Sequence, residues 1–345
     1  MPGVPLQSAH SWLEDLGAGS GLNETRVTVY WRCPVYKVGL ARAEQSYDAV
    51  KRALELIRHD VSVPTDRPVL IKPNMVVRNV ELCATPVGAV SAALEFLASV
   101  GVERFLIAEG TGDAEGDTMA AFREYGYRAL AERYKVEFVN LHDDEKLVLE
   151  GLDANLNPVT LRLAKRLFTS YVVSIAKMKT HKRVVATLAI KNIAVAAIYN
   201  PDRHSPAWYA LDPTKFSHDP RPLNLSLARL AQVLPIGLAI VDGVVGMEGN
   251  GPVNGTPIHS GVALAGTDAL AVDLVGADLM GFDPRTIGYL WYLSQIRGLS
   301  RENVLVVGEN PATCVTRYKA CENMQELLAW WVPDWKRYLK AEVLD

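Results

Sequence analysis

The sequence has few cysteines, no excess of charge of one sign and no long apolar run. Its 4 cysteines, at positions 33, 83, 314 and 321, form no CxxC pair and no cluster spacing. We therefore expect neither an iron–sulfur cluster in this chain nor a disulfide framework. The formal charge of −3 argues against a nucleic-acid-binding surface. No run of about 18 apolar residues is present, so no membrane span is expected.

The first thirty residues lack the basic-then-apolar pattern of a secretion signal, which makes a cytoplasmic protein the default expectation. The composition, 49% hydrophobic and 22% charged over 345 residues, is that of an ordinary globular protein. This length suits two α/β lobes, or one large domain with a lid. We expect a small molecule as the partner, rather than nucleic acid or a membrane, and a homo-oligomer stays open.

Strand-like and helix-like segments alternate along the chain. Apolar runs predict strands at 27–32, 68–71, 104–108, 136–140, 171–176, 235–241, 261–265 and 304–307. Apolar stripes and capping signals predict helices at 47–59, 86–100, 118–134, 186–198, 223–234 and 269–280. This rhythm implies right-handed crossovers and an α/β fold with a mainly parallel or mixed sheet flanked by helices.

The predicted organisation is two lobes with a site between them. A leader at 1–26 precedes an N-terminal α/β lobe at 27–170. The C-terminal α/β lobe at 171–310 contains a long loop at 199–222, rich in Pro, His and Asp, which reads as a lid. A helical tail at 311–345 follows.

Polar clusters stand at the ends of several predicted strands, namely Lys72-Pro73-Asn74, Glu109-Gly110-Thr111, Lys177 to His181, and Asp242-Gly243. In open α/β sheets the ligand crevice lies outside the carboxyl ends of the strands. A single cluster is equally typical of a solvated turn. Four of them together favour one shared site.

The segment from Asp242 to Gly255, DGVVGMEGNGPVNG, is the most unusual stretch. Glycines at positions such as Gly249 and Gly251 let backbone N–H groups approach a ligand, so the segment predicts a ligand loop. The alternative is a long glycine-rich surface turn. The acids Asp242 and Glu248, together with Glu109, are predicted to bind a hard divalent cation through oxygen.

The run Lys177-Met-Lys-Thr-His181 is the strongest indication of a chemical site in the sequence, because it is a cluster of cationic side chains. If it is extended, Lys177, Lys179 and His181 share one face, and the crowded cations call for an anion or for acids from another strand. A crowded lysine has a lowered pKa and serves as a base or nucleophile. The alternative is a solvated basic turn.

A second lysine lies in the apolar helix predicted at 186–198. A buried lysine such as Lys191 must pair or lose its charge, which favours a functional role for Lys191 and Asn192 over a structural salt bridge. His218, in the predicted lid, is a further candidate. Asp268 is predicted to cap the helix at 269–280, and buried Asp273 to have a partner such as Lys191 or Lys72.

Taken together, these motifs resemble the DUF362 family, a domain of unknown function. The resemblance covers about 38–307 and rests on Ile71-Lys-Pro-Asn74, Glu109-Gly110, Lys177 to His181, Ile190-Lys-Asn192, Asp242 to Pro252, and Gly266-Thr-Asp268 with Asp273. Many members of that family carry a ferredoxin-type cluster segment. This chain lacks those cysteines, which puts electron transfer in doubt.

Two classes of function remain, with a redox protein third. The first is an enzyme of isomerase or lyase type that acts on a small carboxylate or phosphate, with Lys179, His181 and Lys191 as catalytic residues. The second is a protein that binds a metal or anionic cofactor without turnover. Further ligand-binding candidates are Lys72, Asn74, Thr111, Lys177, Asn192, His218, Gly249 and Gly251, and the metal candidates are Glu109, Asp242 and Glu248.

Overall fold

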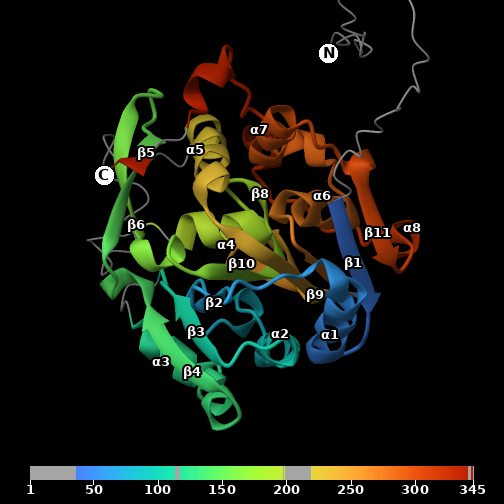
Figure 1. The fold of residues 1–345 in the computed structure, drawn as a ribbon. Coiled ribbons are helices and arrows are strands. Elements are labelled where there is room, and N and C mark those ends of the chain that lie inside the picture. Colours follow the sequence, from blue (N-terminus) through green and yellow to red (C-terminus); the bar gives the residue numbers. More distant parts are fainter. Residues whose placement is uncertain (1–35, 113–116, 197, 199–218, 341–342, 345) are drawn as a thin grey trace, which may run out of the picture. The chain divides into compact units, whose positions relative to one another are not determined.

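The computed structural model describes residues 36–112, 117–196, 198, 219–340 and 343–344, and Figure 1 shows its ribbon. The predicted leader at 1–26 and the predicted strand at 27–32 lie outside the described residues. So do His218 and the predicted lid loop up to residue 218.

A nine-stranded mixed sheet forms the centre of the described chain, in the order β11-β1-β10-β9-β7-β2-β3-β4, with β8 paired to β7. Only β10 and β8 run antiparallel to the other strands. The predicted α/β class with a mainly parallel, mixed sheet is therefore confirmed. Its strands are β1 (Tyr36–Arg42), β2 (Val69–Lys72), β3 (Arg104–Glu109), β4 (Lys135–Asn140), β7 (Tyr171–His181), β8 (Val185–Thr187), β9 (Ile236–Asn250), β10 (Asn254–Gly266) and β11 (Val304–Gly308).

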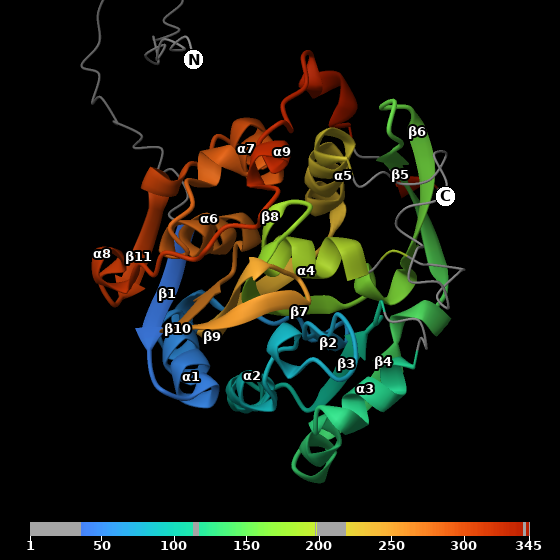
Figure 2. The same cartoon turned by 180° about the vertical axis from the view of Figure 1, so that it is seen from behind.

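Helices cover both faces of this sheet. In Figure 1 one set lies below the sheet and comprises α1 (Ser46–Leu56), α2 (Val87–Ser99) and α3 (Thr118–Glu124). The other set lies above it and comprises α4 (Ala189–Ala196), α5 (Pro220–Val233), α6 (Ala269–Leu279) and α7 (Gly288–Arg297). The reverse view in Figure 2 shows the same two layers.

The alternation of side chains along each strand explains the two layers. In β2, Val69 and Ile71 join the apolar core with α1 and α2, whereas Leu70 joins the core with α4 to α7. Because successive residues of a strand face opposite sides, a strand buried on both faces is a continuous apolar run. That is the pattern that predicts these strands from sequence.

Several predicted elements have boundaries that differ from those expected, and two of the helices show why. The helix predicted at 118–134 ends at Glu124 and resumes as a 3₁₀ helix, Tyr127–Glu132, because Gly126 between them adopts a φ of 76°. The helix predicted from 186 begins only at Ala189, since Val185–Thr187 forms β8.

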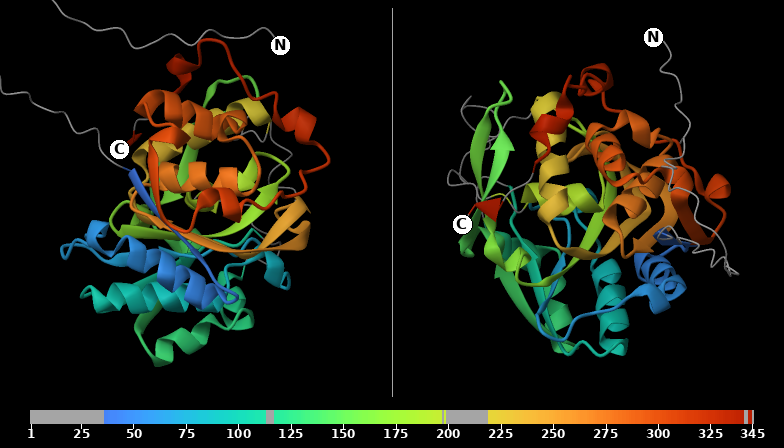
Figure 3. Two further views of the ribbon diagram at one scale, coloured as in Figure 1. Left: turned by 90° about the vertical axis from the view of Figure 1, so that its right-hand side faces the viewer. Right: turned by 45° about the horizontal axis from the view of Figure 1, so that its top comes forward.

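A second, three-stranded sheet contains a hairpin that is not predicted from the sequence. Its strands are β5 (Lys146–Leu152), β6 (Pro158–Ala164) and β12 (Val343–Leu344). The hairpin stands beside α5 (Figure 3), joined to it by an ion pair of 2.5 Å between Arg229 and Glu150. The predicted C-terminal helices are present but short: α8 (Pro311–Cys314) and α9 (Met324–Leu327).

The predicted boundary between the lobes, at residue 170, falls immediately before β7. Strands from both sides of that boundary share the large sheet, where β7 lies between β9 and β2. Among the residues that the structure describes, no helix is long and apolar enough to cross a membrane.

Candidate functional site

The carboxyl ends of neighbouring parallel strands bring the predicted polar clusters together. Strands β9, β7, β2, β3 and β4 are consecutive in the sheet and run in the same direction. Their final residues therefore meet at one edge of the sheet. A small pocket of about 70 Å³ opens there, which is room for a few water molecules or for one anionic group of similar size.

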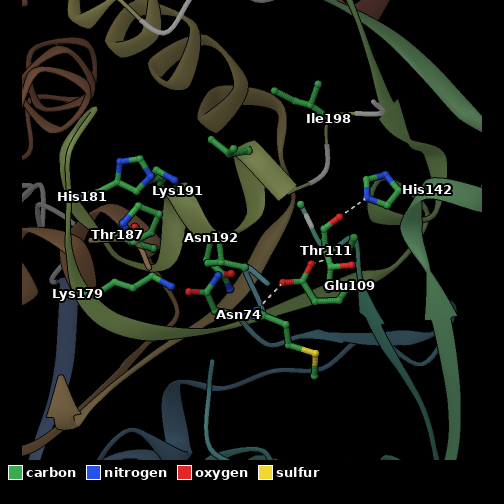
Figure 4. A pocket seen from close by; sticks show the side chains of 16 residues that line it. Asn74, Glu109, Thr111, His142, Lys179, His181, Thr187, Lys191, Asn192 and Ile198 are labelled. Atoms are coloured by element: carbon green, nitrogen blue, oxygen red, sulfur yellow. Dashed lines mark hydrogen bonds between the residues drawn. The ribbon is translucent and has the colours of Figure 1, made fainter. Parts of the chain in front are cut away.

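The pocket has a cationic side and a side that carries a carboxylate. Figure 4 shows Lys179, Lys191, His181 and Thr187 on one side, and Glu109, Thr111 and His142 on the other, with Asn74 and Asn192 between them. The remaining described lining is mainly apolar: Met75, Val76, Val195, Ile198 and Pro252.

Lys72 has a structural role beneath the pocket. Its ammonium lies 2.9 Å from Oε1 of Glu109 and donates to Oδ1 of Asn192 at 3.1 Å and to the Pro73 carbonyl at 2.9 Å. Glu109 also accepts from the Met75 backbone N–H at 2.8 Å. Burial lowers the pKa of Lys72 and the neighbouring Glu109 opposes that shift. With three acceptors around it, the Lys72 ammonium holds β2, β3 and α4 together.

Successive side chains of β7 point to opposite sides of the sheet, as the sequence predicts, and its two lysines bind different partners. Lys177 lies 3.1 Å from Oδ2 of Asp242 on β9 and forms a second buried ion pair. Lys179 donates to the carbonyl of Cys83 at 2.7 Å. Met178 points to the opposite side and packs in the core with α4 to α7. Lys177 and Asp242 are not among the residues that line the pocket.

Lys191 enters the pocket from the first turn of α4. That turn is held by Asp273 of α6, whose carboxylate accepts from the backbone N–H groups of Ala189 at 2.7 Å and Ile190 at 3.0 Å. The expectation that Asp273 pairs with Lys191 or Lys72 is therefore wrong. The N–H groups at a helix start have no partner within the helix. Here the side-chain oxygens of Asp273 accept from two of them, although burial raises the pKa of Asp273 to about 8.

Two lysines of the pocket have no carboxylate partner among the described residues. Lys179 is fully buried and Lys191 is 8% exposed, and no described acid lies within ion-pair distance of either. Burial lowers the pKa of Lys179 to about 7, with the charges of Lys177 and Lys72 adding to the shift and Cys83 and Glu109 opposing it. Burial likewise lowers the pKa of Lys191 to about 7, and the charges of Lys179 and Lys72 add to it.

The two histidines of the pocket present opposite tautomers. Nδ1 of His181 accepts from the Arg183 backbone N–H at 3.1 Å, so a neutral His181 carries its proton on Nε2. Nε2 of His142 lies 3.0 Å from the Thr111 carbonyl and must donate to it, so a neutral His142 keeps its lone pair on Nδ1. These assignments follow from the hydrogen-bond network. One ring is thus set up as a donor and the other as an acceptor.

Two polar atoms at the pocket have no hydrogen-bond partner among the described residues: Oδ1 of Asn74 and Oγ1 of Thr187. Their residues are 6% and 2% exposed. Buried polar atoms are rarely left unpaired in proteins, and each exception calls for an explanation such as a bound molecule. Both side chains line the pocket, where a ligand would supply the missing contacts.

The glycine-rich segment is mostly strand, and the loop predicted there is wrong. Asp242 to Asn250 continues β9, and β10 pairs back along it. At Gly251 a Cβ would collide with the Thr180 carbonyl, so glycine is required there for close packing against β7. Neither Gly249 nor Gly251 lines the pocket; of this hairpin, only Pro252 reaches it among the described residues.

The three predicted metal ligands are held apart by separate partners. Glu109 pairs with Lys72, Asp242 pairs with Lys177, and Glu248 accepts from the Lys319 backbone N–H at 2.7 Å on the outer part of the hairpin. Across the described parts of the chain, no group of three or more His, Cys, Asp or Glu side chains is arranged to hold a metal ion. The structure does not gather these acids into one centre.

Some lining residues are absent from the sequence-based candidates, above all His142 and Thr187. His142 follows the end of β4, so the strand-end rule that selects Lys72 and Glu109 would also have selected it. Thr187 lies on β8, a three-residue strand inside a segment that reads as helix, and no sequence signal marks it.

Comparison with known proteins gives a family, a relative in sequence and solved structures of low similarity. The family model described as "Domain of unknown function (DUF362)" matches residues 69–278. The "Thylakoid-associated protein sll1697" of Synechocystis is 28% identical over 227 residues, which are 65% of this chain and 66% of that protein's length.

Two solved structures share a TM-score of 0.42 with this chain. One is the crystal structure of a protein from Thermotoga maritima, with 12% identity over 73% of this chain and 59% of the other. The second is the lactate racemase apoprotein from Thermoanaerobacterium thermosaccharolyticum, with 17% identity over 70% of this chain and 56% of the other. Both TM-scores lie below 0.5, so neither structure informs the function of this chain.

Proposed function

The chain belongs to the DUF362 family, described as a domain of unknown function, and we propose from its own pocket that it binds a small carboxylate or phosphate and acts on it by proton transfer. The observation that carries this proposal is an excess of buried positive charge. Four lysines are buried at or beside the strand ends, namely Lys72, Lys177, Lys179 and Lys191. Two of these lysines form ion pairs: Lys72 with Glu109, and Lys177 with Asp242.

The two remaining lysines, Lys179 and Lys191, explain why the ligand would be an anion. Burying unpaired ammonium groups is unfavourable, and they respond by losing a proton or by acquiring a negative partner. A pKa of about 7 for each lysine means that both responses are accessible near neutral pH. A bound anion would hold the lysines protonated, and its departure would release a proton.

Proton transfer is supported by groups that border the same pocket and can accept or donate a proton. Lys191 and Nδ1 of His142 would accept a proton, while Nε2–H of His181 would donate one. Removal of a proton next to a carboxylate, as in an isomerase or lyase, requires an acceptor, and a cation that stabilises the charge which develops on the substrate. Lys179, fixed by the Cys83 carbonyl, would supply that cation.

Two measurements test the proposal. The first is thermal stabilisation by acetate, lactate or phosphate, compared with chloride at equal ionic strength. We expect the stabilisation to be lost in Lys179→Met and Lys191→Met. It should persist in Lys165→Met, which alters an exposed surface ion pair, and in Glu248→Gln, which lies away from the pocket. Equal stabilisation in all four variants would overturn the anion site.

The second measurement uses NMR to follow the exchange of hydrogen for deuterium in D₂O, at the carbon next to the carboxylate of acetate or lactate. Catalysed exchange should fall at least about 100-fold in Lys191→Met, the usual scale for a lost acid–base group. Stabilisation without any exchange would instead support the alternative, a protein that binds an anionic ligand without turnover. The predicted divalent metal stays a prediction, which elemental analysis of the purified protein tests.

A further inference from the structure

The two unpaired lysines of the pocket differ in what surrounds their amino groups. Lys179 donates to the Cys83 carbonyl at 2.7 Å, which fixes the position of its ammonium. For Lys191, the described residues provide no hydrogen-bond or ion-pair partner. A lysine is a nucleophile only when its nitrogen is neutral and its lone pair is not engaged. By geometry, Lys191 fits this requirement and Lys179 does not.

The electrostatic surroundings separate the two lysines in the same way. Cys83 and Glu109 oppose the loss of charge at Lys179, whereas among the described residues no neighbouring group opposes it at Lys191. At Lys191 burial and the charges of Lys179 and Lys72 all lower the pKa, to about 7. A lysine beside other cations in a dry pocket is a known way to obtain a reactive amine.

We propose that Lys191 is a nucleophile that forms an imine with a small acid bearing an aldehyde or ketone next to its carboxylate. This rests on the proposed function, because the carboxylate would lie against Lys179. The amine nitrogen attacks the carbonyl carbon and forms the C–N bond. The carbonyl oxygen then leaves as water with the two protons of the amine, and a C=N bond replaces C=O.

Other groups at the pocket match the steps of this reaction. The carbonyl oxygen must be protonated before it leaves, and a neutral His181 holds its proton on Nε2. The tetrahedral intermediate carries a hydroxyl, for which Oγ1 of Thr187 and Oδ1 of Asn74 are available, since neither has a hydrogen-bond partner in the described part of the chain. The imine withdraws electrons and makes adjacent C–H bonds more acidic. With the Lys191 nitrogen in the imine, Nδ1 of His142 is the acceptor left for the proton transfer proposed above.

Reductive trapping tests the inference on the full-length protein, with glyoxylate as the probe. Cyanoborohydride reduces an imine of glyoxylate to a stable carboxymethyl-lysine, which peptide mass spectrometry locates. At pH 7 about half of an amine with a pKa near 7 is neutral, against less than one in a thousand for an ordinary lysine. After allowance for restricted access, we expect Lys191 to be labelled at least tenfold faster than the exposed Lys165.

Three comparisons make the result decisive. Lys191→Met should lose the fast adduct, and acetate, which has a carboxylate but no aldehyde or ketone, should slow labelling of the wild type. Lys179→Met should reduce labelling by glyoxylate more than labelling by acetaldehyde, which has no carboxylate. Labelling of Lys191 no faster than that of Lys165 would overturn the inference, and if acetate still stabilises the protein through Lys179, anion binding would stand. If no anion stabilises the protein, the proposed function itself fails.

Discussion

Replacing Lys191 with methionine should flatten the rise of stability with pH. The pKa of Lys191 is about 7 in the folded protein, against its ordinary value of 10.5. Between these two values the unfolded chain binds a proton that the folded chain does not. The free energy of unfolding therefore rises with pH in this window, by up to about 1.4 kcal/mol per pH unit for one lysine.

The expected magnitude follows from the two pKa values. Between pH 8 and pH 10 one such lysine contributes a rise of about 2 to 3 kcal/mol, because the lysine of the unfolded chain begins to lose its proton toward pH 10. Methionine has a similar length and no titrating group. The free energy of unfolding of Lys191→Met minus that of the wild type should therefore fall by about this amount over the same range.

Urea unfolding at pH 8, 9 and 10, in a buffer without carboxylate or phosphate, measures this difference. Lys165→Met is the matched control. Glu145 raises the pKa of Lys165, so the Lys165 side chain stays protonated in the folded protein between pH 8 and pH 10. Its curve should run parallel to that of the wild type. If the Lys191→Met curve is parallel as well, Lys191 is charged in the folded protein and the reasoning about the pocket is wrong.

Three further substitutions test the framework of the pocket. Glu109→Gln breaks the buried pair with Lys72 and should lower the free energy of unfolding by about 3 to 5 kcal/mol; urea unfolding with an unchanged midpoint would contradict it. Asp273→Ala removes the carboxylate from the start of α4 and should cost about 2 kcal/mol, and calorimetry should also show weaker anion binding, because α4 carries Lys191. Asp268→Ala removes the cap of α6, which accepts from Ala271 at 2.9 Å, and should cost about 1 kcal/mol with anion binding unchanged; a loss of binding would contradict its purely structural role.

The fold is readable from the sequence where burial alone decides the pattern. Strands such as β2 and β3 are buried on both faces and appear as apolar runs, and Asp268 caps α6 as predicted. The segment after Asp242 is misread because glycine has two uses that look alike in a sequence. It permits turns, and it also permits close packing within a strand. At Gly246 the deciding fact is the side chain of Tyr318, against which a Cβ would collide, and only the tertiary structure supplies it.

The location of the site can be predicted from the sequence, but the ion-pair partner of each lysine cannot. The strand-end rule locates the edge where Lys72, Lys179 and Glu109 meet, because it depends only on the order and direction of strands. Which acid forms an ion pair with which lysine depends on the register between neighbouring strands. The pairing of β7 with β9 places Lys177 opposite Asp242, and its register then shifts before Lys179. Beyond the shift Lys179 lies opposite Met247, and its ammonium donates to the Cys83 carbonyl. The excess of positive charge at the pocket is thus a consequence of register, which a list of charged residues cannot reveal.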